Sequence, residues 1–323
     1  MKKTLLTATA LAFALSTAMA QNNQTAVQQN GLRNAASVSQ QGSDNAVLIQ
    51  QADSYSNPYY HTQDNQASVS QVGDRNNARL SQSTYSERNT ATILQHGDDN
   101  TAFQVQVPFA KDNVAHIEQY GTNNQASQRQ NEVNESMASI YQAGSNNSAE
   151  QSQVFLHDNI ADIYQQGNGN MAEQAQNGFH NVASATQTGD NNTAVQWQRT
   201  GDLEATIVQT GSGNSHEQDQ MTRSVRNTAT AIAVGDNNYG YQTQVGSDNT
   251  SEIYQVGDYN SASSVQNAGT WFLDGNHSNL TVQTGNYNMA ETTQLGNAGG
   301  AISTIDQSGD YNTATVVQYS IRR

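Results

Sequence analysis

Cysteine is absent from the 323-residue chain, and only two prolines occur. Without cysteine the chain can form no disulfide, no thiolate nucleophile and no cysteine-ligated zinc site. Basic residues are also few, because 13 Lys and Arg stand against 28 Asp and Glu and give a formal net charge of −15. An acidic chain repels phosphates, so nucleic-acid binding is not expected. Hydrophobic residues make up 34%, below the roughly 45–50% of globular domains, which argues against an ordinary apolar core.

Amide side chains are what the sequence has in abundance. It contains 40 Gln and 38 Asn, together 78 of the 323 residues. A chain so rich in Gln and Asn is either disordered or prone to β assembly. The order in which these residues occur decides between the two.

Residues 1–20 have the pattern of a removable export signal. Two lysines lie near the start, residues 5–15 are apolar, and Ala18 and Ala20 fit the small-x-small cleavage rule. Cleavage before Gln21 is therefore expected, and it leaves a more acidic mature chain. A membrane anchor is the alternative, but the apolar run is shorter than the roughly 20 residues that span a bilayer. No later segment is apolar enough to serve as a transmembrane span.

Twelve copies of a motif Gly-x-x-Asn follow one another at a spacing of 22–24 residues, with two longer intervals of 31 and 28 residues, and further copies lie between them. Gln lies two positions before each glycine except in one copy, which has Ala233, and another Gln lies six residues after each Asn. The unit reads N-x-A-x-x-x-Q-x-G-x-x-N-x-A-x-x-x-Q. Residues 34–323 thus hold twelve repeats, preceded in residues 21–33 by a partial one. The twelve glycines are Gly42, Gly73, Gly97, Gly121, Gly144, Gly167, Gly189, Gly211, Gly235, Gly257, Gly285 and Gly309.

Each repeat is predicted to form two strands joined by a turn. Small or apolar residues alternate in both halves, as in Ala115 and Ile117, and a period of two indicates a strand with one inward face. The Asn and Gln of the motif lie at even offsets from Ala, so they share that face. The glycine permits the positive φ that the turn between the strands requires. Pro58 and Pro108 both lie in the connectors between repeats, where a missing N–H costs no strand hydrogen bond.

A single strand pair cannot bury its inward face, but repeats stacked in register can. The sequence therefore predicts an all-β solenoid in which each strand pairs with the same strand of the next repeat, and equivalent amides form hydrogen-bonded ladders. A buried amide without a partner costs roughly 1–3 kcal/mol, which explains why the amide positions repeat. The expected ladder residues include Gln40, Asn45, Gln51, Gln71, Asn76, Gln82, Gln95, Asn100, Gln106, Gln119, Asn124, Gln130, Gln307, Asn312 and Gln318.

The two ends of such a stack would expose unpaired strand edges. Soluble repeat proteins protect their ends with polar caps, and this sequence shows no such cap. Open ends with the same pattern favour head-to-tail addition of further copies, a contact that does not close and so produces a filament.

The repeat resembles the curlin repeat of bacterial curli fibre subunits, whose pattern is Ser-x5-Gln-x-Gly-x-x-Asn-x-Ala-x3-Gln. The resemblance covers residues 34–318, nearly the whole mature chain. The leading Ser of the family is mostly Asn here, as at Asn65 and Asn89, and the second turn glycine of the family occurs only as Gly169 and Gly213. Twelve repeats also exceed the five of the best-known members.

The resemblance implies an extracellular amyloid subunit of the biofilm matrix, with roles in adhesion and surface attachment. It implies secretion through the periplasm of a Gram-negative bacterium and an outer-membrane channel, with accessory proteins and a nucleator subunit as partners. Regular repeats and an acidic chain favour the major subunit, while the basic end Arg322-Arg323 leaves the minor nucleator as the alternative. Family members depend most on terminal ladders, which here would be Gln40, Asn45, Gln51, Gln307, Asn312 and Gln318.

No cofactor, metal site or catalytic site is expected. Asp98-Asp99 is a solvated turn pair, and neither a nucleophile elbow nor a nucleotide-binding glycine loop occurs. The calcium-binding nonapeptide is absent, so turn aspartates such as Asp74 are expected to form turns and to slow premature stacking by charge. The histidines show no metal-ligand spacing and are expected in loops or facing solvent, with substitutions at two inward positions tolerated. They are His61, His96, His116, His157, His180, His216 and His277.

Two other functions compete with a fibre subunit. A monomeric β-solenoid that binds ice would need a regular outward array, but outward residues such as Thr92, His116 and Glu118 are irregular. A general adhesin module stays open. A carbohydrate-active β-helix enzyme would need clustered carboxylates, and none cluster in the sequence. Tyr141 and Tyr164 are expected to point outward and cover the surface, with binding of hydrophobic partners as the alternative.

Overall fold

The computed structural model describes residues 22–52, 62–221, 225–268, 276–296 and 300–320. The predicted export signal, Pro58 and His61 lie outside these described residues. The described part contains 25 strands in two sheets and contains no helix long and apolar enough to cross a membrane. The expectation of an all-β solenoid is confirmed.

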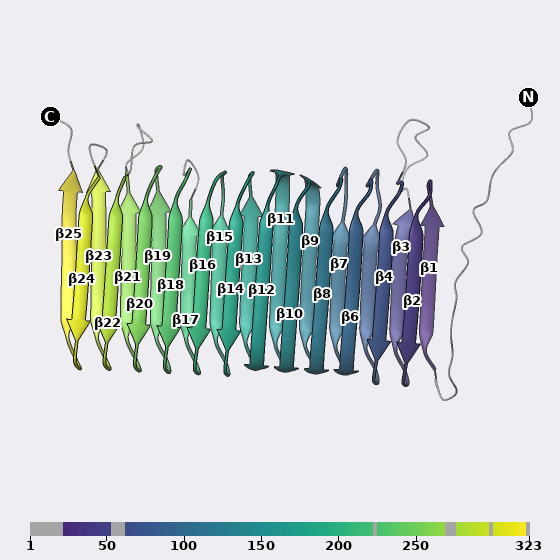
Figure 1. Cartoon of the computed structure of the whole chain (residues 1–323), viewed down its shortest axis with the longest axis horizontal. Coiled ribbons are helices and arrows are strands. Elements are labelled where there is room, and N and C mark those ends of the chain that lie inside the picture. The colour runs from purple at the N-terminus through teal and green to yellow at the C-terminus, as the bar shows by residue number, and fades with distance from the viewer. Residues whose placement is uncertain (1–21, 53–61, 222–224, 269–275, 297–299, 321–323) are drawn as a thin grey trace, which may run out of the picture.

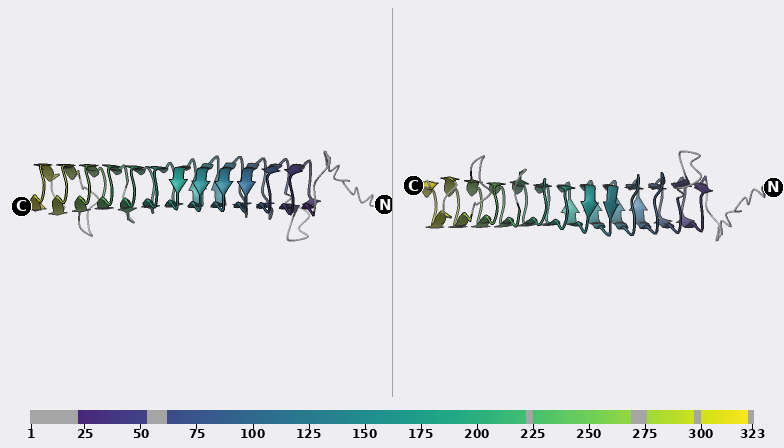
Figure 2. Two further views of the ribbon diagram at one scale, coloured as in Figure 1. Left: turned by 90° about the horizontal axis from the view of Figure 1, so that it is seen from below. Right: turned by 90° about the horizontal axis from the view of Figure 1, so that it is seen from above.

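The strands stack along one axis into two facing parallel sheets (Figure 1), and the end-on rows of strands in Figure 2 show the two layers. We call an even-numbered strand and the odd-numbered strand that follows it a rung; β1 precedes the first rung. The 13-stranded sheet consists of β1 (Gln24–Asn30), β3 (Ala46–Ala52), β5 (Asn77–Gln82), β7 (Thr101–Gln106), β9 (Gln125–Asn134), β11 (Ser148–His157), β13 (Met171–Asn177), β15 (Thr193–Gln198), β17 (Ser215–Gln220), β19 (Tyr239–Val245), β21 (Ser261–Asn267), β23 (Met289–Gly296) and β25 (Thr313–Ser320). The 12-stranded sheet consists of β2 (Ala35–Gln41), β4 (Gln66–Val72), β6 (Thr90–Asp98), β8 (Val114–Thr122), β10 (Met137–Ser145), β12 (Ile160–Asn168), β14 (Val182–Thr188), β16 (Glu204–Thr210), β18 (Thr228–Val234), β20 (Thr250–Val256), β22 (Ser278–Thr284) and β24 (Ile302–Ser308).

The register follows the repeat. In the pairing of β10 with β12, Gln142 lies opposite Gln165 and Gly144 opposite Gly167. Side chains alternate inward and outward along each strand, because successive residues of a strand point to opposite faces. A shift of one residue would expose every inward side chain, so the repeated pattern fixes the register.

The interior between the sheets is partly aliphatic and partly amide. Ala and Ile fill it on the 12-stranded side, as in the buried Ile117, Ile140 and Ile163. Across from them, the 13-stranded sheet contributes Ala and, in the middle of the stack, a second buried Gln per strand. This mixed core explains how a chain with little hydrophobic content still folds.

The glycine turns need glycine for two reasons. Gly121 has φ +103°, a region that side-chain-bearing residues rarely adopt. A Cβ added to Gly121 would also lie 2.1 Å from the carbonyl oxygen of Gly144 in the next rung. The turns therefore stack so closely that any side chain at this position would collide with the neighbouring rung.

Candidate functional site

The most extensive polar feature of the structure is a set of glutamine ladders along the stacking axis. In the 12-stranded sheet, Nε2 of Gln119 donates to Oε1 of Gln142 at 2.8 Å, and Gln142 donates to Gln165 at 2.8 Å. In the 13-stranded sheet, Gln82 donates to Gln106 and Gln106 to Gln130, each at 2.8 Å. The structure places the remaining predicted glutamines in the same two ladders, namely Gln40, Gln51, Gln71, Gln95, Gln307 and Gln318.

Each glutamine ladder has a direction, and the backbone sets it. The Nε2 group of Gln142 also donates to the carbonyl oxygen of Gln125 on the opposite sheet at 3.0 Å. Only the nitrogen end of the amide can satisfy a carbonyl, so the oxygen end must face the preceding rung. Every glutamine ladder bond therefore runs from an earlier rung to a later one.

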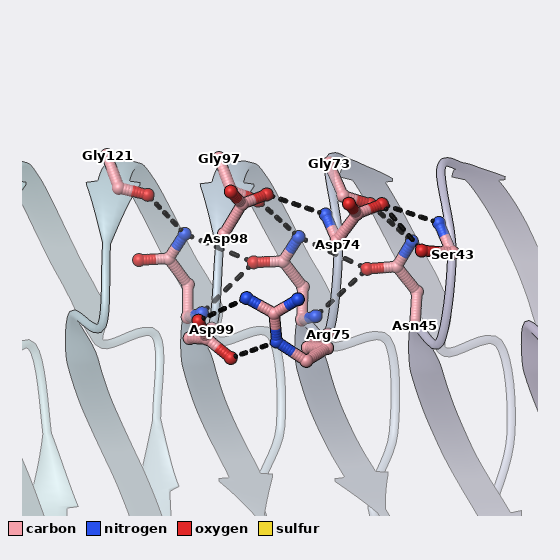
Figure 3. A network of polar contacts seen from close by, with 11 residues as sticks. Ser43, Asn45, Gly73, Asp74, Arg75, Gly97, Asp98, Asp99 and Gly121 are labelled. Carbon is pink, nitrogen blue, oxygen red and sulfur yellow. Dashed lines mark hydrogen bonds and ion pairs between the residues drawn. The ribbon is translucent and has the colours of Figure 1, made fainter.

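The asparagine ladders beside the glycine turns run the other way (Figure 3). The backbone N–H of Asn76 donates to Oδ1 of Asn45 at 2.9 Å, and its Nδ2 donates to the same oxygen at 3.2 Å. Nδ2 of Asn76 also donates to the carbonyl oxygen of Gly97 in the next rung at 2.6 Å. Asn100 and Asn124 repeat this geometry, and Asn312 bonds to Asn288 in the same way at the last rung. One asparagine thus connects three successive rungs.

A third glutamine ladder occupies the middle of the 13-stranded sheet, from Gln104 to Gln242. It begins where the preceding rung has Leu80. Oε1 of Gln104 consequently has no donor among the described residues, as expected for the first member of a directional ladder. It ends where Nε2 of Gln242 donates to Ser251 across the interior.

The turn aspartates also connect rungs. Oδ1 of Asp74 accepts hydrogen bonds from the backbone N–H of Ser43 at 2.8 Å and from its hydroxyl at 2.9 Å (Figure 3). The N–H of Asp74 in turn donates to Oδ1 of Asp98 at 2.8 Å. The hydrogen bonds from Ser43 lower the pKa of the Asp74 carboxyl. These carboxylates were expected to form turns and to repel other copies; they also hold neighbouring turns together.

His216 bridges an interruption in one glutamine ladder. The ladder of the 12-stranded sheet has Ala233 where Gln is expected, which leaves Gln209 and Gln255 two rungs apart. From the opposite sheet, Nδ1 of His216 lies 3.1 Å from Nε2 of Gln209, and its Nε2 lies 3.0 Å from Oε1 of Gln255. The two contacts require the Nε2–H tautomer, so His216 stands in for the missing glutamine.

The space for this imidazole comes from a glycine. A Cβ added to Gly240, in the next strand of the sheet, would lie 2.2 Å from Cδ2 of His216. Complete burial lowers the pKa of His216 to about 4, so the ring is neutral at pH 7. The three departures from the repeat at His216, Ala233 and Gly240 therefore form one compensating set.

The two histidines that the sequence places at inward positions, His216 and His277, are both 1% exposed. A second asparagine ladder lies at the other ends of the strands, where Asn89 donates to Asn65. His277 takes the place of an asparagine in this ladder. Its Nδ1 accepts the backbone N–H of Ala301 at 3.1 Å, and its own N–H donates to Oδ1 of Asn249. It serves the ladder because an imidazole nitrogen can accept as an amide oxygen does. Burial lowers the pKa of His277.

The predicted outward tyrosines lie on the outer face and contact each other. The rings of Tyr141 and Tyr164 stack at 4.8 Å between centroids. A second column that the sequence interpretation missed lies at the glycine turns near the C-terminal end, where Tyr259 stacks on Tyr287 at 4.9 Å and Tyr287 on Tyr311 at 5.0 Å. The sequence could have predicted this column, because each of the three tyrosines lies two residues after the turn glycine of its repeat.

Both ends of the described stack present open strand edges. Strands β1 and β2 at one end, and β24 and β25 at the other, each pair with a strand on one side only. Gln318 accepts from Gln294 at 3.0 Å and donates to the carbonyl oxygen of Ile302. At the opposite end, Gln29 begins the same ladder by donating from Nε2 to Oε1 of Gln51 at 2.7 Å.

A scan against protein-family models finds no match to this chain, and a search of curated proteins finds no similar sequence.

Proposed function

We propose that the protein is the structural subunit of an extracellular amyloid fibre of the curli type, in which copies add end to end. In this proposal the fibre contributes to the biofilm matrix, adhesion and surface attachment. The subunit would be exported through the periplasm and an outer-membrane channel, and a nucleator subunit would start the fibre. The chain itself would have no enzymatic activity.

The observation that carries the proposal is the direction of the ladders. At the C-terminal end the glutamine ladders present N–H groups and the asparagine ladders present oxygens. At the N-terminal end the glutamine ladders begin with acceptors instead, because Gln29 and Gln40 donate to the next rung and Oε1 of Gln40 accepts from the Thr25 hydroxyl and from no ladder glutamine. A head-to-tail contact would therefore match donors with acceptors, whereas a head-to-head contact would oppose groups of the same kind.

The inward side chains at the two ends are also compatible with the stacking of one copy on another. The end strands carry the aliphatic residues Val27, Val38, Ile305 and Val316 at their central inward positions. A second copy stacked on either end would meet apolar surface there and continue the interior. Burying that surface favours association by roughly 25 cal/mol for each Å² removed from water.

Concentration-dependent growth tests the proposal. Purified mature protein at tens of micromolar is expected to form fibres that bind thioflavin and give a meridional reflection near 4.7 Å. A protein that stays monomeric for days would contradict the proposal and favour a monomeric solenoid module. If the protein instead starts fibres of a different subunit from the same cell and forms none of its own, it is the nucleator and the assignment as major subunit fails.

The ends are expected to matter more for growth than the middle. Gln318→Ala should slow fibre elongation about 5-fold, which corresponds to roughly 1 kcal/mol for one hydrogen bond. Gln142→Ala, the matched control, removes the ladder acceptor of Gln119 and the ladder donor of Gln165. It should lower the free energy of unfolding by about 2–5 kcal/mol with little effect on elongation. Seeded elongation rates and urea unfolding separate the two effects. Equal slowing by both variants would remove the special role of the ends.

A further inference from the structure

At the edge of the solenoid opposite the glycine turns, one backbone position repeats in nine consecutive rungs, from Asp64 to Asp248. Asp158 has φ +58°, and its N–H donates to the carbonyl oxygen of Asn134 in the preceding rung. The equivalent residues of the neighbouring rungs share the sign of φ, and all of those named below except Arg226 make the same hydrogen bond. We call this set the corner column: Asp64, Arg88, Asp112, Glu135, Asp158, His180, Asp202, Arg226 and Asp248.

Charges in the corner column are paired toward both ends of the stack. Arg88 binds Asp112 through two hydrogen bonds of 2.7 Å, and Arg226 binds Asp248 through bonds of 2.6 and 2.7 Å. Between these pairs the column contains no arginine. Its middle is therefore acidic, with one histidine between two aspartates.

Two histidines and an aspartate converge in this middle part. Nδ1 of His157, at the end of β11, lies 2.6 Å from Oδ2 of Asp158, and Nε2 of His180 lies 3.4 Å from the same oxygen. One ligand atom from each of the three residues lies within 4.8 Å of the other two. Ligand atoms around a tetrahedral zinc ion are separated by about 3.3 Å, since the metal–ligand bonds are about 2.0–2.1 Å. Small rotations of the exposed rings would bring the three atoms to this separation.

A fourth residue orients one of the rings. Nδ1 of His180 lies 3.1 Å from Oδ1 of Asp202 in the next rung. A proton on Nδ1 shared with Asp202 leaves the lone pair of Nε2 directed toward Asp158 and His157. Histidines that bind metals commonly donate their second ring N–H to a carboxylate in this way, which fixes the tautomer and strengthens the ligand.

The neighbouring aromatic ring limits how the histidines move. Phe179 stacks on His157 at 6.2 Å between centroids and meets the ring of His180 edge-on at 5.3 Å. The rings of His157 and His180 contact each other edge-on at 5.2 Å. Both histidines are about half exposed, so one side of the cluster stays open to water.

We propose that His157, Asp158 and His180 form a binding site for a divalent transition-metal ion, with zinc as the best match to two imidazoles and one carboxylate. Asp202 is a positioning residue that orients His180. The open side would hold water as the fourth ligand. This site does not depend on the proposed function, because it is complete within one copy of the chain.

Titration with zinc chloride tests the site. Freshly purified full-length mature protein, in competition with a chromophoric chelator, is expected to bind one zinc ion per chain. His180→Ala and Asp158→Asn should each weaken binding at least 10-fold. Asp202→Asn should weaken it about 10-fold, the lower end of the effect of outer carboxylates on metal affinity. X-ray absorption of the complex should show two imidazole ligands.

His116→Ala is the matched control, because His116 is exposed to a similar extent and lies 3.5 Å from a single carboxylate oxygen of Glu118. Its zinc affinity should equal that of the unchanged protein, and circular dichroism of all variants should be unchanged since the residues lie on the surface. The proposal would be overturned if the protein did not bind one zinc ion per chain, or if His180→Ala bound zinc as tightly as the unchanged protein. Binding lost equally in His116→Ala would mean nonspecific histidine contacts and would also overturn it.

Discussion

Lowering the pH from 7 to 4 is expected to reduce the free energy of unfolding by about 3 kcal/mol through His216 alone. The pKa of His216 falls from 6.5 to about 4 on folding because the ring is completely buried. Between these values the unfolded chain binds more protons than the folded chain, so stability decreases as the pH falls. Well above pH 6.5 His216 is neutral in both the folded and the unfolded chain, so it no longer makes the free energy of unfolding depend on pH.

A triple variant isolates this effect. His216→Ala, Ala233→Gln and Gly240→Ala together restore the repeat pattern, with a continuous ladder from Gln209 to Gln255. The triple variant should fold at pH 7 and lose the part of the acid sensitivity that belongs to His216. Urea unfolding of both proteins at pH 7, 5 and 4 measures the difference, since the effects of the carboxylates and of His277 are common to both. The same pH dependence in both proteins would show that His216 is not the cause.

The single change His216→Ala should be more harmful than the triple variant. It leaves Oε1 of Gln255 without its donor, leaves Nε2 of Gln209 with only the carbonyl oxygen of Thr193, and opens a cavity beside Gly240. Each buried unsatisfied group costs about 1–3 kcal/mol. Recovery of stability in the triple variant at pH 7 would show that the three positions act as a set.

Gly121→Ala is expected to lower the free energy of unfolding by about 4 kcal/mol. Part of this loss comes from forcing a side-chain-bearing residue to φ +103°, which costs about 1–3 kcal/mol. The remainder comes from the new Cβ, which would lie 2.1 Å from the carbonyl oxygen of Gly144 and force the two turns apart. Chemical denaturation of the monomer measures the loss.

Gly309→Ala is the matched control, because Gly309 has a similar φ of +97° and its added Cβ would meet only Nδ2 of Asn312, at 3.7 Å. Its monomer should lose only the strain, about 1–3 kcal/mol. Fibre growth should nevertheless slow strongly, because a second copy stacked on this end would bring a carbonyl oxygen against the new methyl group. Unimpaired growth of Gly309→Ala would contradict stacking at this end, while equal destabilisation by both changes would mean that the close approach of turns is unimportant.

The fold was predictable because the alternation of inward residues, the spacing of the repeats and the positions of the amides all indicate the same structure. The alternation in Ala115 and Ile117 gave strands and their inward faces, the regular spacing gave the parallel register, and the recurring Gln142 and Asn76 gave the ladders. Two-residue alternation and a fixed period leave few other ways to bury the same set of side chains.

Three features could not be predicted from the sequence, because they depend on contacts between side chains and backbone of different rungs. The direction of each ladder follows from carbonyl groups across the interior, such as that of Gln125, and not from the motif itself. His216, Ala233 and Gly240 lie on three different strands, so each appears separately as a departure from the pattern. The cluster of His157, Asp158 and His180 was hidden because the two histidines lie 23 residues apart in chain segments whose sequences vary.

The opposed directions of the two kinds of ladder have an electrostatic consequence. Amide groups aligned in one direction add their dipoles, as peptide groups do along a helix. In this solenoid the glutamine columns point from earlier to later rungs, and the asparagine columns point back. Their fields partly cancel, which reduces the opposite partial charges at the two extremities of the stack.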